Sequence, residues 1–155
     1  MKPDWKKLLL SLAIPLGVGG LAALLSGGMD TYQALQQPPL SPPGWLFPIV
    51  WTVLYLFMGY ASYRIAKSDA PASQRKAALT FYGIQLFFNF LWPILFFRFQ
   101  WYWAAFILLL VLWVFIYITM YRFETIDETA ENLLIPYLLW VTFAGYLNLG
   151  VALLN

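Results

Sequence analysis

Long apolar stretches separated by short polar segments dominate the hydrophobic pattern of this chain. Five of these stretches reach the roughly 20 mainly apolar residues that a helix needs to cross a bilayer. They are continuous and do not alternate apolar with polar positions, which argues against a transmembrane β-barrel. The spans are expected at residues 8–26, 46–66, 77–97, 101–122 and 133–154. The pattern therefore predicts an all-α integral membrane protein, with residues 1–155 forming one bundle of five transmembrane helices.

Charge is scarce and unevenly distributed. Of the 155 residues, 62% are hydrophobic and 10% charged, against about 25% charged in soluble domains. Eight of the nine basic residues lie in the N-terminus or in the segments after the second and fourth spans, and Arg98 alone lies on the other side. The positive-inside rule then predicts a cytoplasmic N-terminus and an external C-terminus.

The segment between the first two spans, residues 27–45, is rich in proline. Its second half reads PPLSPPGW over residues 38–45. Proline fixes φ and lacks an N–H, so this run cannot be a helix interior and is expected to be a stiff, extended loop. A stiff loop beside aromatic residues at a membrane surface predicts a lid over a binding cavity.

Small residues and prolines mark particular positions within the spans. Gly19, Ala23 and Gly27 recur every four residues, a stripe that lets another helix approach closely. Pro93 lies deep in the third span and is expected to kink it. Pro136 is expected in the first turn of the fifth span, where proline is tolerated.

The side chains most often used for catalysis and metal binding are missing from the spans. The chain has no cysteine, which excludes disulfide and thiolate chemistry, and no histidine, the usual general base and haem ligand. Tyrosine remains as an alternative haem ligand. The acidic residues at 124–131 allow two interpretations, a metal site or a solvated loop leading into a helix N-terminus, and the second is favoured. No metal site is predicted.

Two amides occupy one face of the third span. Gln85 and Asn89 stand four residues apart, with Trp92 three further along on the same face. Amides within a bilayer are expected to face protein or a cavity rather than acyl chains. They either bond helices together, the more common role, or contact a ligand.

In two other spans, aromatic residues also share one face of the helix with polar or small residues. Trp51 and Tyr55 share a face of the second span, and Trp140, Ala144 and Asn148 share a face of the fifth. Each tryptophan alone is most simply a packing residue. Three such faces beneath one rigid loop instead favour a cavity for a large, flat, apolar ligand.

The combined motifs resemble the tryptophan-rich sensory protein/translocator protein family, also called the peripheral-type benzodiazepine receptor family. The matching runs are residues 37–45 (QPPLSPPGW), 48–55 (PIVWTVLY), 58–63 (MGYASY), 85–97 (QLFFNFLWPILFF) and 136–148 (PYLLWVTFAGYLN). They cover nearly the whole chain in order.

This resemblance implies a five-helix bundle in a bacterial cell membrane, commonly a homodimer, that binds porphyrins and isoquinoline-carboxamide or benzodiazepine-type compounds. It also implies light- and oxygen-dependent breakdown of protoporphyrin, with porphyrin as ligand or substrate, Trp51 and Trp140 as the reactive residues, no required cofactor and no nucleic-acid partner. The ligand-binding residues that it implies are Pro42, Trp51, Tyr55, Asn89, Phe90, Trp92, Trp140, Ala144 and Leu147.

Two other functions remain open from the sequence. One is the facilitated passage of porphyrins or similar amphiphiles, although the lack of membrane carboxylates and internal repeats argues against coupled transport. The other is a regulatory membrane protein that senses a ligand and signals to partners.

Overall fold

The computed structural model describes residues 2–27 and 30–155, and every regular element in this part of the chain is helical. Five of its helices are long and apolar enough to cross a membrane, which confirms the predicted number of spans. The elements are α1 (Trp5–Ser26), α2 (Asp30–Ala34), α3 (Leu46–Ala66), α4 (Ala72–Pro93), the π-helix η1 (Ile94–Arg98), α5 (Tyr102–Glu124) and α6 (Glu128–Leu154).

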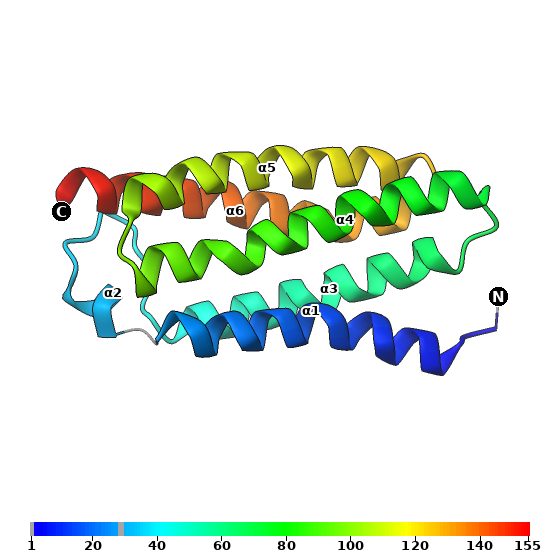
Figure 1. Cartoon of the computed structure of the whole chain (residues 1–155), viewed down its shortest axis with the longest axis horizontal. Helices are drawn as coiled ribbons and strands as arrows, with labels where there is room; N and C mark the ends of the chain where they lie inside the picture. The colour runs from blue at the N-terminus through cyan, green and yellow to red at the C-terminus, as the bar shows by residue number, and fades with distance from the viewer. Residues whose placement is uncertain (1, 28–29) are drawn as a thin grey trace.

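The long helices run side by side and form a closed bundle (Figure 1). α1 packs beside α3 and α4, α3 beside α6, α6 beside α5, and α5 beside α4. The two termini lie at opposite ends, as five crossings require, and α2 lies at the same end as the C-terminus (Figure 1). This end is called the loop end below. Which side of the membrane it faces remains the prediction made from the basic residues.

The helices extend beyond several predicted spans because hydropathy detects only their apolar part. α1 begins at Trp5, after Asp4 caps it by accepting a hydrogen bond from the Lys7 N–H. α4 begins at Ala72, five residues before the predicted span, and α6 at Glu128, again five residues before. Polar first turns, which are stable outside the hydrocarbon region, account for both differences.

The two prolines inside the later spans behave differently. At Pro93 the α-helix ends and gives way directly to η1, so the expected disturbance takes the form of a change in hydrogen-bonding pattern. The placement of Pro136 in a first turn was wrong. Because Asp127 starts α6 early, through its carboxylate bond to the Thr129 N–H, Pro136 lies in the helix interior.

Glycine allows α1 and α3 to approach each other closely. A Cβ atom on Gly59 would lie 2.7 Å from the Ser11 carbonyl oxygen, and one on Gly19 would lie 2.2 Å from the Tyr55 ring. Neither position could hold a larger side chain without movement of its neighbour. The small residue Gly19 in the predicted stripe therefore accommodates a side chain of α3 within the same chain.

The proline-rich loop is fastened to the end of α6. The Tyr146 hydroxyl donates to the Pro39 carbonyl at 2.6 Å, and the Asn155 side-chain amide donates to the Gln36 carbonyl at 2.8 Å. A Cβ atom on Gly150 would lie 2.4 Å from Pro38, so the loop rests directly on this glycine. The loop is thus held at the loop end by both hydrogen bonds and packing.

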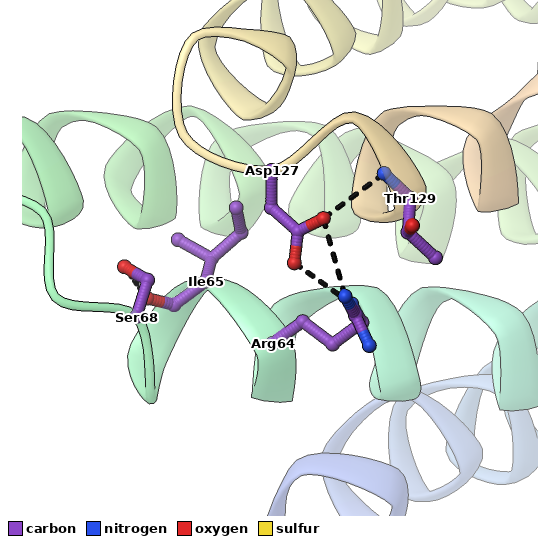
Figure 2. Close-up of polar contacts among 5 residues, drawn as sticks. All are labelled: Arg64, Ile65, Ser68, Asp127 and Thr129. Atoms are coloured by element: carbon purple, nitrogen blue, oxygen red, sulfur yellow. Dashed lines mark hydrogen bonds and ion pairs between the residues drawn. The ribbon is translucent and has the colours of Figure 1, made fainter. Parts of the chain in front are cut away.

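An ion pair joins α3 to α6 at the opposite end of the bundle (Figure 2). The Arg64 Nε lies 2.7 Å from the Asp127 Oδ2, and Arg64 Nη2 lies 3.4 Å from Oδ1. The same carboxylate accepts the Thr129 N–H at 2.9 Å, so Asp127 both caps α6 and anchors it to α3. Asp127 belongs to the acidic segment of the sequence, and these two structural contacts occupy its carboxylate.

Candidate functional site

A cavity of about 340 Å³ lies near the loop end, between α1, α3 and α4. It is called the larger cavity. Its volume falls within the roughly 300–1,000 Å³ of sites that bind small molecules. Its described walls are mainly aromatic and aliphatic, with the amide of Asn89 and the hydroxyls of Ser26 and Thr52 as further polar groups. The lining residues are Leu16, Gly19, Gly20, Ala22, Ala23, Ser26, Phe47, Pro48, Trp51, Thr52, Tyr55, Asn89, Trp92, Pro93 and Phe97.

Trp51 and Tyr55 form one wall of the larger cavity as a stacked pair. Their ring centroids are 5.6 Å apart with the planes inclined at 29°. Trp51 also meets the ring of Tyr137 edge to face at 6.2 Å, and Gly19 leaves room for the Tyr55 ring from the side of α1. The indole is therefore held by two aromatic neighbours, with its remaining surface available to the cavity.

Asn89 lies at the centre of a buried hydrogen-bond chain that crosses three helices. The Tyr55 hydroxyl donates to Asn89 Oδ1 at 2.8 Å, and Asn89 Nδ2 donates to the Tyr137 hydroxyl at 2.8 Å. Tyr137 donates in turn to Gln85 Oε1 at 2.7 Å. Gln85 thus bonds helices together, and Asn89 does the same while lining the cavity. Asn89 retains one N–H and one lone pair for a ligand.

Trp92 is fixed in the wall between α4 and α6. Its indole N–H donates to Asn148 Oδ1 at 2.9 Å, and the Asn148 amide donates to the Tyr102 carbonyl, also at 2.9 Å. The ring stacks on Phe96 with centroids 5.2 Å apart. Trp92 therefore offers a ring face to a ligand, while its donor is already used.

A second, smaller cavity of about 20 Å³ lies on the α6 side of Trp51 and Trp92. This is room for about one water molecule. Four aromatic residues, Phe47, Trp51, Trp92 and Phe97, line both cavities and separate them. The smaller cavity is completed by Tyr32, Phe96, Trp140, Ala144, Leu147 and Asn148.

The predicted site residues consequently fall into four groups. Trp51 and Trp92 line both cavities, Tyr55 and Asn89 line the larger one, and Trp140, Ala144 and Leu147 line the smaller one. Phe90 is half-buried on α4 and Pro42 is half-buried in the loop, and neither lines a cavity. Pro42 instead accepts a hydrogen bond from the Tyr32 hydroxyl at 3.3 Å.

The Trp140 side chain has an unused donor. Its ring meets Phe47 edge to face at 5.8 Å, and its buried Nε1 has no hydrogen-bond partner among the described residues. A buried N–H without a partner is unfavourable. This donor is therefore suited to an acceptor atom in the smaller cavity, which has room for about one water molecule.

Sequence reasoning missed the contribution of α1 and of two phenylalanines. Leu16, Gly19 and Ser26 form the wall opposite Trp51, and Phe47 and Phe97 divide the cavities. The stripe of small residues was the available signal for α1, because small side chains leave space as well as permitting close packing. No comparable signal marks Phe47 or Phe97 among the 13 phenylalanines.

The described lining of both cavities carries no charged side chain. The only titratable group there outside the spans is the Tyr32 phenol, whose pKa is raised above its usual value, mainly by burial. It remains a neutral hydrogen-bond donor at neutral pH. The described lining is thus suited to apolar ring systems and single polar atoms, and it contains no carboxylate, imidazole or amine side chain.

The chain is similar to known proteins over nearly its whole length. Residues 11–154 match the model of the TspO/MBR family. The chain belongs to the TspO/MBR family. It is 36% identical to the tryptophan-rich protein TspO of Chlorobaculum tepidum, over 96% of this chain and 98% of that protein. It is 37% identical to the tryptophan-rich sensory protein of Cereibacter sphaeroides, over 100% of this chain and 95% of its relative.

The similarity extends to animal members of the TspO/MBR family. The translocator protein of Ovis aries is 34% identical over 96% of this chain and 89% of its own length. Membership and five apolar helices together make this chain a multi-pass integral membrane protein.

Proposed function

We propose that this TspO/MBR protein binds flat, largely apolar aromatic molecules in the larger cavity. Tetrapyrroles such as protoporphyrin are the proposed natural ligands, and isoquinoline-carboxamide and benzodiazepine-type compounds are the proposed synthetic ones. The observation that carries this proposal is the stacked pair Trp51 and Tyr55 facing an uncharged cavity. Indole and phenol faces bind aromatic rings without charge pairing, and the free N–H of Asn89 can orient one acceptor atom.

We also propose that bound protoporphyrin is oxidised when it is illuminated. The porphyrin absorbs the light, and dioxygen accepts the electrons that the ring loses. Trp51, which lines both cavities, and Trp140, which lines the smaller one, are electron-rich residues, and they relay or quench the oxidising equivalent. The described part of the lining supports this chemistry because it holds aromatic side chains and no charged side chain.

Binding is tested by titrating protein in lipid nanodiscs with metal-free protoporphyrin and, separately, with haem, following tryptophan fluorescence. Without histidine or cysteine to ligate iron, the two affinities are expected to be similar. Trp103→Phe is a matched control, because Trp103 is 52% exposed and lines neither cavity. Haem that binds far more tightly, with the spectrum of ligated iron, would contradict the proposal.

The photochemical step is tested by the loss of porphyrin absorbance under light and oxygen. The unmodified protein and Trp103→Phe are expected to accelerate this loss relative to empty nanodiscs. Trp51→Phe and Trp140→Phe are expected to slow it while still binding porphyrin. An unchanged rate in both variants would remove the tryptophans from the mechanism. Movement of intact porphyrin across sealed vesicles, without degradation, would favour facilitated passage instead.

A further inference from the structure

The larger cavity is open along one side. Four of its lining residues are exposed, and all four belong to α1 or α3: Gly20, Ala23, Pro48 and Thr52. The lining residues contributed by α4 and η1 are buried or half-buried. The opening therefore lies between α1 and α3, and these four residues form its rim.

The face of α3 that meets α1 shows why the opening exists. Pro48, Thr52, Tyr55 and Gly59 recur at spacings of four, three and four, so they share one face of the helix. At Gly59 the two helices nearly touch, since a Cβ atom would lie 2.7 Å from the Ser11 carbonyl oxygen. At Thr52 and Pro48 the same face is exposed. The helices thus diverge toward the loop end.

The inner part of the rim is expected to lie within the hydrocarbon region, since the 21 residues of α3 are about the number that crosses it. Thr52 is six residues into α3, which corresponds to about 9 Å along the helix axis. Its hydroxyl donates to the Pro48 carbonyl at 2.6 Å, so the one polar rim group is satisfied within its own helix and needs no water. The other rim residues are small or apolar. The opening is therefore compatible with lipid and has no group that holds water.

The proline-rich loop, by contrast, is held in place at the loop end. The loop is fastened to α6 through Tyr146, Asn155 and the packing of Pro38 on Gly150. None of the described loop residues 35–45 lines the larger cavity. A path from water beneath residues 36–39 would disturb those contacts, whereas the described residues form no side-chain hydrogen bond across the rim from α1 to α3.

We propose that ligands reach the larger cavity sideways from the bilayer, through the opening between α1 and α3. The ligands are then molecules that dissolve in the membrane before they bind. A cavity open to water would not require them to do so. This inference rests on the proposed function, since it concerns access to the cavity that binds the ligand.

The decisive experiment closes the opening with a reversible chemical cross-link between α1 and α3. Because the chain has no cysteine, Ala23→Cys with Thr52→Cys places two unique thiols on opposite sides of the opening. A short bis-thiosulfonate reagent can join them, and a reductant releases them. The control pair, Pro39→Cys with Tyr146→Cys, joins the loop to α6 where they already touch. Protoporphyrin association and dissociation are followed by tryptophan fluorescence in nanodiscs, before bridging, after it and after reduction.

Bridging the rim is expected to slow association and dissociation alike, by about tenfold or more, with recovery on reduction, as expected for a closed gate. Bridging the loop is expected to leave both rates unchanged. The reverse pattern would overturn the proposal in favour of access past the loop. Binding that is normal but not slowed by the rim bridge overturns the route alone. Absence of binding in the unmodified protein overturns the proposed function and the route with it.

A second measurement needs no double variant. Protoporphyrin and its dimethyl ester are compared at the same free aqueous concentration, at which the less polar ester is the more concentrated in the bilayer. Access from the bilayer predicts faster association for the ester. Equal association rates at equal aqueous concentration would contradict the route. Ala23→Leu, compared with Leu24→Ala on the 80% exposed neighbour that does not line the cavity, provides a single-residue check: slower association is expected in Ala23→Leu only.

Discussion

Two glycines of α1 provide the sharpest contrast at the scale of single residues. A Cβ atom on Gly19 would lie 2.2 Å from the Tyr55 ring, whereas one on Gly17 would meet nothing within 4 Å. Gly19→Ala is expected to displace Tyr55 from its stack with Trp51 and to weaken protoporphyrin binding by about tenfold, comparable to the loss of one aromatic contact. Gly17→Ala is the matched control and is expected to bind normally. Equal affinities in a fluorescence titration would mean that the stack does not form the binding surface.

The hydrogen-bond chain through Asn89 makes a different prediction. Asn89→Leu leaves the hydroxyl of Tyr55 without an acceptor in a buried site and is expected to destabilise the fold by about 1–3 kcal/mol. Tyr55→Phe removes a single donor and should cost about 1 kcal/mol, with the aromatic stack retained. Thermal unfolding in the same detergent measures both changes. If Tyr55→Phe proves the more damaging variant, Asn89 is not the centre of the chain.

At the scale of whole elements, the junction of α3 and α6 depends on Asp127. Asp127→Asn keeps an oxygen for the Thr129 N–H but removes the charge that pairs with Arg64, and it is expected to cost less than about 1 kcal/mol because the pair is partly exposed. Asp127→Ala also removes the cap and is expected to cost about 1–2 kcal/mol. Both values come from thermal unfolding at low and high salt. The loss of stability in Asp127→Asn, relative to the unmodified protein, should become smaller at high salt. A loss that does not depend on salt would rule out the ion pair as its cause.

The elements themselves were largely predictable from the sequence, and their contacts were predictable only in part. Hydropathy located all five helices, because a bilayer demands long apolar runs. Helical periodicity placed Gln85 and Asn89 on one buried face, and the structure confirms that both are buried. Periodicity cannot say what lies opposite a face. For that reason Trp51 and Trp140 were assigned to one cavity. In the structure they share only the smaller cavity, and of the two only Trp51 also lines the larger one.

At the scale of the whole molecule, the uncharged site predicts an unusual tolerance to pH. Burial raises the pKa of Tyr32, so its neutral form is the one that the fold stabilises. The contribution of Tyr32 to the free energy of unfolding is complete below the ordinary tyrosine pKa of about 10, and it is lost only as pH rises above that value. The affinity for an uncharged isoquinoline-carboxamide ligand is therefore expected to stay constant from about pH 6 to pH 9. A titration midpoint within this range would reveal an ionisable contact that the cavity lining does not contain.

The central claim is that a flat aromatic ligand binds between α1, α3 and α4, against Trp51. The most direct measurement is a structure of the protein in a lipid nanodisc with protoporphyrin bound. The account predicts that the ring lies in contact with Trp51 and Tyr55, with one edge directed toward the opening at Ala23 and Thr52. Porphyrin found on the outer surface of the bundle or on the loop, with the larger cavity empty, would contradict it.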